Sequence, residues 1–312
     1  MNVGPNLDAE TDAEVDFGRS QRFQQLPSVW RIIIRRLAVR RTGMVPFTGS
    51  DVVNTLALMM LGVVVVWTLV PGWVTTHDPL VGDTAEKFLP PSLSHWFGTD
   101  RAGRDTFTRV VHGTHNTVFG AIISTVIGLS IGSTIGVVAG VARGVSDAVL
   151  MRLVDVLLAI PGFLLALCVV SAFGPGTAKI AIGVGIAAIA PFARVARSEA
   201  LRVVQLDFVD AARMSGAKPA TVLFRHVLLN SAGPIIALIP IELGATILSI
   251  ASLGFLGYGA PPPEPEWGTL LSEGRDFLAR AWWLTSLPGL VVLCTVLAVS
   301  HASRWLQRQF RI

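Results

Sequence analysis

Long stretches of the chain contain no charged side chain, and this feature limits the possible folds more than any other. Between Val52 and Thr76 there is no Asp, Glu, Lys or Arg. A transmembrane helix needs about 20 consecutive apolar residues, so this stretch is long enough to cross a bilayer. Only 15% of the 312 residues are charged, against about 25% in ordinary soluble domains. The sequence therefore predicts an all-α integral membrane protein in contact with the lipid bilayer.

Six stretches are predicted as transmembrane helices. The third is interrupted by Pro161-Gly162. The fourth is the shortest, because only 14 uncharged residues separate Lys179 from Arg194, a length that fits a re-entrant segment equally well. The predicted spans are residues 52–74, 117–142, 153–173, 180–193, 232–256 and 282–300.

The distribution of basic residues sets the predicted orientation. With six spans and a cytoplasmic N-terminus, 18 of the 25 Lys and Arg residues fall on the inner side, as the positive-inside rule requires. If the fourth stretch did not cross, the basic C-terminal tail would lie outside. We therefore predict that both termini are cytoplasmic, and we attribute the net charge of +4 to basic inner loops rather than to nucleic-acid binding.

Four further segments lie outside the predicted bundle. Residues 1–28 are polar and acidic without the apolar core of a signal peptide, and we predict a disordered cytoplasmic tail. Residues 29–51 mix large apolar side chains with arginines, which predicts a basic amphipathic segment on the inner leaflet; a solvated lead-in is the alternative. Residues 75–113 are predicted as an extracytoplasmic loop and residues 305–312 as a cytoplasmic tail.

Motifs for covalent chemistry are absent from the sequence. None of its three lysines follows a glycine, so it contains no phosphate-binding GxxxxGK loop. It has no HExxH motif, no pair of cysteines at zinc-binding spacing and no GxSxG motif. We therefore predict no catalytic residue, no metal site and no cofactor in this chain. If transport here uses ATP, another chain must hydrolyse it.

A polar, basic segment, residues 206–230, separates two of the predicted spans. Ala211 and Ala212 favour a helix, Gly216 can end it, and Pro219 suits the first turn of a second helix. The sequence thus predicts a short helix, a bend and a second helix on the cytoplasmic side. By itself this pattern fits two interpretations, an amphipathic helix that covers the bundle or a helix that another protein approaches.

The segment resembles the EAA loop in permease subunits of bacterial ABC importers, which reads Glu-Ala-Ala, three residues, then Gly. Asp210 stands for the usual Glu, and Leu229 stands where the peptide-importer branch has Pro. The resemblance implies that the loop contains a coupling helix, which docks into a groove on the ATPase subunit. The residues assigned to this coupling role are Asp210, Ala211, Ala212, Ser215, Gly216, Ala217, Lys218 and Pro219.

Three other segments resemble C-type permeases of oligopeptide, dipeptide and nickel importers. One contains Arg152 and Asp155, which we expect to pair at one helix end; a transport site is the alternative. Another is the Pro-x-Trp-Gly segment at 251–275. The third matches a Gly-Thr-Asp-x-x-Gly-Arg-Asp pattern. It is either a self-paired loop that caps the second span or a surface that meets a substrate-binding protein. Its residues are Gly98, Thr99, Asp100, Gly103, Arg104 and Asp105.

Glu242 lies within the fifth predicted span. An intramembrane carboxylate is costly and marks a functional hypothesis by default. One hypothesis places Glu242 on the transport pathway, in contact with a cationic part of the substrate. The alternative is that Glu242 pairs with, or hydrogen-bonds to, a partner permease.

The resemblance covers residues from about 30 to the end and implies a type I ABC importer permease fold, with a five-helix core at 114–304. It implies a homologous B-type permease, two ABC ATPase domains that hold ATP and Mg, and an extracytoplasmic substrate-binding protein as partners. The implied location is the bacterial plasma membrane, and the implied substrates are di- or oligopeptides. Import of nickel, haem or glutathione is the close alternative. A stand-alone secondary transporter or channel is the distant one, since no inverted repeat is found.

Overall fold

The computed structural model describes residues 49–310, and those from Asp51 onward belong to one compact unit. The predicted tail 1–28 and almost all of segment 29–51 lie outside the described residues. Within 49–310 every regular element is a helix, and one isolated bridge joins Thr99 to Asp105. The α-helices are α3 (Gly49–Leu69), α4 (Thr106–Ile127), α5 (Ser133–Ala142), α6 (Gly144–Ala159), α7 (Gly162–Phe173), α8 (Thr177–Val204), α9 (Asp207–Met214), α10 (Pro219–Thr221), α11 (Leu229–Leu253), α12 (Trp267–Arg275) and α13 (Trp283–Phe310).

Short 3-10 and π turns connect or extend these helices. Wide π turns join α4 to α5, α10 to α11, and extend α11 at its end. Because Leu229 stands where the family has Pro, its backbone N–H is retained, and the turn before it continues directly into α11. The short elements are η2 (Pro71–Trp73), η3 (Thr84–Glu86), η4 (Gly128–Gly132), η5 (Val222–Leu228) and η6 (Gly254–Tyr258).

Five helices among the described residues are long and apolar enough to cross a membrane. A sixth span results only if α6 and α7 count as one, and these two helices meet at an angle of 86° around Pro161-Gly162. The protein is therefore a multi-pass membrane protein with five or six spans. The five long helices cover Val52–Leu69, Thr106–Ala142, Thr177–Val204, Val222–Tyr258 and Trp283–Arg304.

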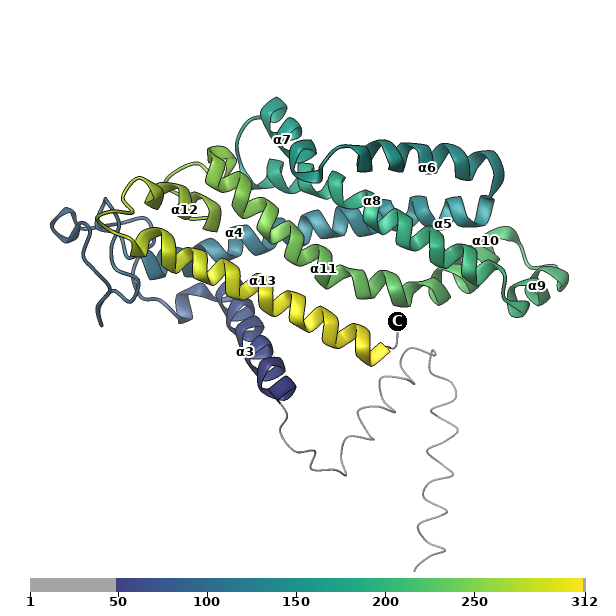
Figure 1. Ribbon diagram of the computed structural model, residues 1–312, viewed down its shortest axis with the longest axis horizontal. Coiled ribbons are helices and arrows are strands. Elements are labelled where there is room, and N and C mark those ends of the chain that lie inside the picture. The colour runs from purple at the N-terminus through teal and green to yellow at the C-terminus, as the bar shows by residue number, and fades with distance from the viewer. Residues whose placement is uncertain (1–48, 311–312) are drawn as a thin grey trace, which may run out of the picture. The chain divides into compact units, whose positions relative to one another are not determined.

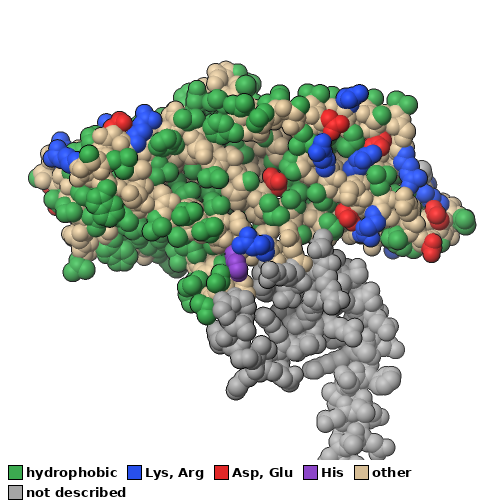
Figure 2. Space-filling model, viewed as in Figure 1, with side chains coloured by type: hydrophobic (Ala, Val, Ile, Leu, Met, Phe, Trp, Pro, Cys, Tyr) green, Lys and Arg blue, Asp and Glu red, His purple; other side chains and the backbone are tan. Residues whose placement is uncertain are grey.

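The two ends of the helices differ in what they contain. The loop before α4 and helix α12 lie at one end, whereas α9 and α10 lie at the other (Figure 1). Figure 2 shows that most charged side chains on this face gather over the two ends, with a largely hydrophobic surface between them. This arrangement places the predicted coupling segment and the predicted outer loop on opposite sides of an apolar belt.

Helix α8 continues well beyond the predicted fourth span. It runs from Thr177 to Val204, through Arg194 and Arg197, so the prediction ended it too early. Arg194 pairs with Asp155 at 3.0 Å, and both oxygens of Asp147 accept hydrogen bonds from Arg197, at 2.6 and 2.7 Å. Arginine is a good helix former, so Arg194 and Arg197 limit the apolar stretch but do not end the helix.

Helix α8 packs at very short range against the continuous helix formed by α4, η4 and α5. A Cβ added at any of four glycines on that helix would come within 2.8 Å of a Cβ atom on α8. Small residues at every fourth position form one helix face and let two backbones approach closely in a membrane. The four glycines are Gly128, Gly132, Gly136 and Gly140.

We predict that Gly136→Ala destabilises the protein, because the new Cβ would lie 2.8 Å from the Cβ of Ala196. Overpacking of this kind costs about 1–3 kcal/mol. Gly62→Ala in α3 is the matched control, since no atom lies within 4 Å of its added Cβ. The thermal unfolding of both variants in detergent measures the difference. Equal midpoints for the two variants would contradict the close contact.

Candidate coupling helix and outer charged cluster

The predicted helix, bend and helix in segment 206–230 are present. Helix α9 ends at Met214, and the next turn is closed by hydrogen bonds from Gly216 N to Arg213 O and from Ala217 N to Ala212 O, at 3.0 and 3.1 Å. Gly216 has φ +82°, a conformation that favours glycine. The second helix begins at Pro219. The sequence thus predicted the local fold of this segment; its docking role stays a prediction.

Val209 is the one buried residue of α9, and the ring of Phe208 also lies 6.2 Å from that of His226 in η5. Val209 is fully buried among apolar residues of α8 and η5. The other large side chains of α9 are open to the surroundings, with Met214 89% exposed and Phe208 42% exposed. Asp210 and Arg213 form an exposed ion pair of 3.4 Å, which contributes little to stability. Much of the surface of α9 is therefore open to contact with another protein.

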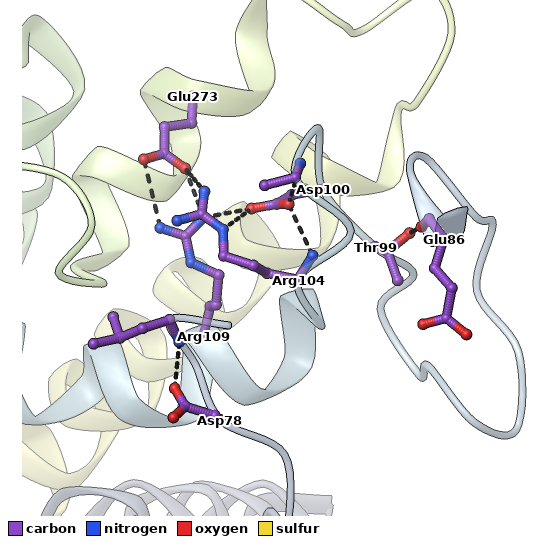
Figure 3. A network of polar contacts seen from close by, with 9 residues as sticks. Asp78, Glu86, Thr99, Asp100, Arg104, Arg109 and Glu273 are labelled. Atoms are coloured by element: carbon purple, nitrogen blue, oxygen red, sulfur yellow. Dashed lines mark hydrogen bonds and ion pairs between the residues drawn. The ribbon is translucent and has the colours of Figure 1, made fainter. Parts of the chain in front are cut away.

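Four charged side chains form a cluster at the opposite end (Figure 3). The carboxylate of Asp100 accepts hydrogen bonds from Arg104 Nε at 2.7 Å and from Arg109 Nη1 at 2.8 Å. Arg109 Nη1 also donates to Glu273 on α12 at 2.6 Å, and Arg109 is only 1% exposed. Two positive and two negative groups thus pair with one another and join the outer loop to α12.

The rest of the outer motif also pairs within the chain. Asp105 caps α4 by accepting a hydrogen bond from Thr108 N at 2.7 Å, and it contacts His95 Nδ1 at 3.0 Å. Thr99 Oγ1 accepts from Leu89 N at 2.8 Å. Gly98 and Gly103 both have a positive φ. Of the two interpretations of this motif, the geometry favours the self-paired loop that caps a span.

Arg101, the exposed residue of this segment, occupies one of the two x positions of the Gly-Thr-Asp-x-x-Gly-Arg-Asp pattern. Asp100, Arg104 and Asp105 are each less than 8% exposed, whereas Arg101 is exposed. A protein that approached this end would therefore meet Arg101 and not the matched charges. Whether a substrate-binding protein does so stays a prediction.

Glu266 is a buried carboxylate that sequence analysis did not single out. As N-cap of α12 it accepts hydrogen bonds from Gly268 N at 2.9 Å, Thr269 Oγ1 at 3.0 Å and Thr117 Oγ1 at 3.4 Å. Burial raises the pKa of Glu266, and these hydrogen bonds oppose that shift. The Pro-x-Trp-Gly motif, which contains Glu266, was the signal in the sequence that could have pointed to this residue. Next to Glu266, Trp267 Nε1 donates a hydrogen bond to Val110 O at 3.1 Å. Glu266 and Trp267 thus attach α12 to α4.

Glu242 lies in α11, inside the span Val222–Tyr258. Its side chain is half-buried, and no hydrogen bond or ion pair to it occurs within residues 49–310. The carboxylate is therefore free for a group outside the part of the chain described here. The location of Glu242 does not distinguish between the two hypotheses, a role on the transport pathway and contact with a partner permease.

Asp155 has a different partner from the one we expected. Its carboxylate lies 3.0 Å from Arg194 of α8, and not against Arg152 one turn away on α6. Both groups of this pair are more than half exposed, so the pair contributes about 0–1 kcal/mol. The bidentate contact of Asp147 with Arg197 is the stronger link between α6 and α8.

Comparison with known proteins places the chain among transport proteins. A family described as binding-protein-dependent transport system inner membrane component matches residues 132–311. The probable D,D-dipeptide transport system permease protein DdpC of Escherichia coli (strain K12) is 36% identical over 247 residues, covering 79% of this chain and 83% of the relative. The glutathione transport system permease protein GsiD of Shigella flexneri serotype 5b (strain 8401) is 40% identical over 259 residues, covering 81% and 83%.

A second peptide permease and one solved structure are also similar. The di/tripeptide transport system permease protein DppC of Pseudomonas aeruginosa (strain UCBPP-PA14) is 36% identical over 251 residues, covering 78% of this chain and 82% of the relative. The inward-facing MetNI methionine ABC transporter aligns with a TM-score of 0.51 at 17% identity, covering 64% of this chain and 96% of that chain. At this low identity the likeness shows the fold alone.

We predict that Glu266 makes stability fall as pH rises. With its pKa raised by burial, the folded protein binds more protons than the unfolded chain above about pH 4. The contribution is fully favourable below the unfolded pKa and is lost as pH rises through the folded pKa. Relative to the wild type, Glu266→Gln should therefore gain stability with rising pH, as measured by unfolding midpoints across a pH series.

Glu264→Gln is the control for this prediction, because Glu264 lies two residues away and is exposed. Its unfolding midpoint should follow that of the wild type at every pH. The opposite slope for Glu266→Gln would mean that the hydrogen bonds donated to Glu266 outweigh burial and hold the carboxylate ionised.

Proposed function

Because the chain belongs to the family of binding-protein-dependent transport system inner membrane components, we propose that it is a permease subunit of an ATP-driven ABC importer. It forms, with a homologous B-type permease, the path for di- or oligopeptides delivered by an external binding protein. The observation that carries this proposal is the identity of 36% with DdpC and with DppC over nearly four fifths of the chain. The proposed location is the bacterial plasma membrane.

In the proposed topology the chain crosses six times, with α6 and α7 as one broken span and both termini in the cytoplasm. The excess of basic residues at the ends predicted to be inside supports this orientation. Helix α9 then faces the cytoplasm, and the charged cluster around Arg109 faces outward. This orientation directs α9 to the ATPase domains and Arg101 to the binding protein.

Helix α9 is the proposed contact with one of two ABC ATPase domains. Its exposed side chains and its attachment through Val209 suit a helix that docks into a partner. Closure of the ATPase domains on ATP and Mg would move α9, and α8 and α11 on either side of it would swing as rigid bodies between inward-open and outward-open states. This chain moves in response to the hydrolysis that its partners perform.

Glu242 is a proposed pathway residue, because its carboxylate lies in a span without a partner among the described residues. We expect Glu242→Gln to reduce uptake of peptides with a cationic group near that carboxylate and to spare neutral ones. Uptake rates of matched cationic and neutral dipeptides measure the effect. Unchanged rates and selectivity would assign Glu242 to contact with the other permease instead.

A second substrate class is supported by one relative. GsiD, 40% identical over 259 residues, is named a glutathione permease, so glutathione import by the same architecture is the alternative, with nickel and haem as further cargoes of this group. Competition of unlabelled glutathione, nickel, haem and dipeptides against uptake of a labelled dipeptide separates these cases.

The coupling role predicts that Gly216→Val removes ATPase domains from the purified complex. Valine is strained at φ +82°, and the turn that orients α9 would change. Gly144→Val is the matched control, because Gly144 has φ +61° and equally open surroundings but lies at the start of α6. Co-purification of the ATPase domains should be lost in the first variant alone.

Two outcomes would contradict this role. Equal retention of ATPase domains in the two variants would place the docking surface elsewhere. Uptake by this chain alone, without any ATPase, would support the distant alternative of a secondary transporter or channel.

A further inference from the structure

The outer loop between α3 and α4 presents large apolar side chains to its surroundings. Leu93 is 98% exposed, Trp73 86% and Trp96 62%. Residues 89–97 around two of them contain no Asp, Glu, Lys or Arg. Exposed apolar groups that gather in one place mark an interaction surface. This part of the loop therefore meets something other than water.

Two of these side chains, Leu93 and Trp96, line one groove. Its volume is about 200 Å³, and it is also lined by Val74 and Phe107 and by the polar side chains of His77 and Asp105. Trp73 directly precedes Val74 in the turn that follows α3. We refer to Trp73, Leu93 and Trp96 as the outer anchor.

Aromatic contacts connect the outer anchor to the membrane-facing helix α3. The ring of Trp96 lies 4.9 Å from that of Phe107, and Phe107 lies 5.7 Å from Trp67. Trp67 is in the last turn of α3, whose apolar span Val52–Leu69 is only 11% buried within the protein. The chain of rings thus joins the anchor to the end of α3, where Trp67 also packs against the core of the bundle.

The length of α3 sets the depth of this surface. Its 18-residue span extends about 27 Å at 1.5 Å per residue, close to the roughly 30 Å of a hydrocarbon core. Trp67 therefore lies near the outer boundary of the hydrocarbon core. Trp96 is connected to Trp67 through the ring of Phe107. Backbone outside a helix cannot face hydrocarbon, whereas tryptophan is enriched at the headgroup level. This depth fits the headgroup region.

We propose that the outer anchor inserts into the headgroup region of the outer leaflet beside α3. The anchor holds the outer loop, and through Asp105 the start of α4, at a defined depth in the bilayer. Because residues 89–97 contain no Lys or Arg, a zwitterionic lipid is sufficient. The proposal holds whichever substrate the protein carries.

The same loop offers a matched position on a different surface. Val81 is 69% exposed, but it lies in a groove with His77, Asp78, Asp83 and Glu86. Asp78, Asp83 and Glu86 do not line the groove of the anchor, and these three carboxylates favour water around Val81. An apolar side chain of comparable exposure is therefore expected in water at position 81 and in lipid at position 93.

The test uses spin labels on the full transporter in phosphatidylcholine nanodiscs. Cys168 and Cys294, the two cysteines of the chain, are replaced by Ala, and Leu93→Cys, Trp73→Cys and Val81→Cys are labelled one at a time. Since all three native side chains project outward, folding should be retained, which size-exclusion profiles check. Collisions with oxygen report lipid, and collisions with a water-soluble nickel complex report solvent.

We expect labels at 93 and 73 to collide more with oxygen than with the nickel complex, and the label at 81 to show the reverse. Nickel accessibility at 93 equal to that at 81 would place the loop in water and overturn the proposal. Shielding of position 93 from both reagents would also overturn it, because a protein partner, such as the second permease or the binding protein, would then cover the surface.

Discussion

The close contact between α8 and the helix that runs from α4 into α5 is the interaction on which the rest of the structure depends. Four glycines leave no side chain between the two backbones, so dispersion contacts act over the whole length of the pair without a hydrophobic driving force, as in other membrane helices. Helices α6, α7 and α11 all pack on α8 as well. A displaced α8 would therefore disturb every neighbour at once.

The outer end is organised by buried polar groups instead. Arg109 and Thr117 on α4 reach Glu273 and Glu266 on α12, so two carboxylates that are 7 residues apart in the sequence both attach α12 to the same helix. Removing one member of such a set takes one partner from a buried charged group, and breaking a buried pair costs several kcal/mol. The outer loop is thus part of the scaffold.

The sequence predicted the apolar spans and the turn at Gly216 because both depend on local patterns. It ended α8 at Arg194, since hydropathy alone cannot show that Asp155 lies opposite that arginine on another helix. It also could not show the link between Arg109 and Glu273, which are separated by 164 residues. Glu266 lies inside the segment 251–275 that resembles C-type permeases. Its unusual property is its burial, which the motif does not reveal. In each case the sequence lacked information on which side chains, far apart along the chain, contact each other.

The single buried contact of α9 has a mechanical consequence. Val209 is the one buried residue of α9, so much of this helix is exposed. Along the backbone, α8 stops at Val204 before α9, and the helix from Pro219 begins after it. A displacement of α9 would therefore act on both neighbouring helices through short turns, and the stiffness of those turns would set how much of it is transmitted.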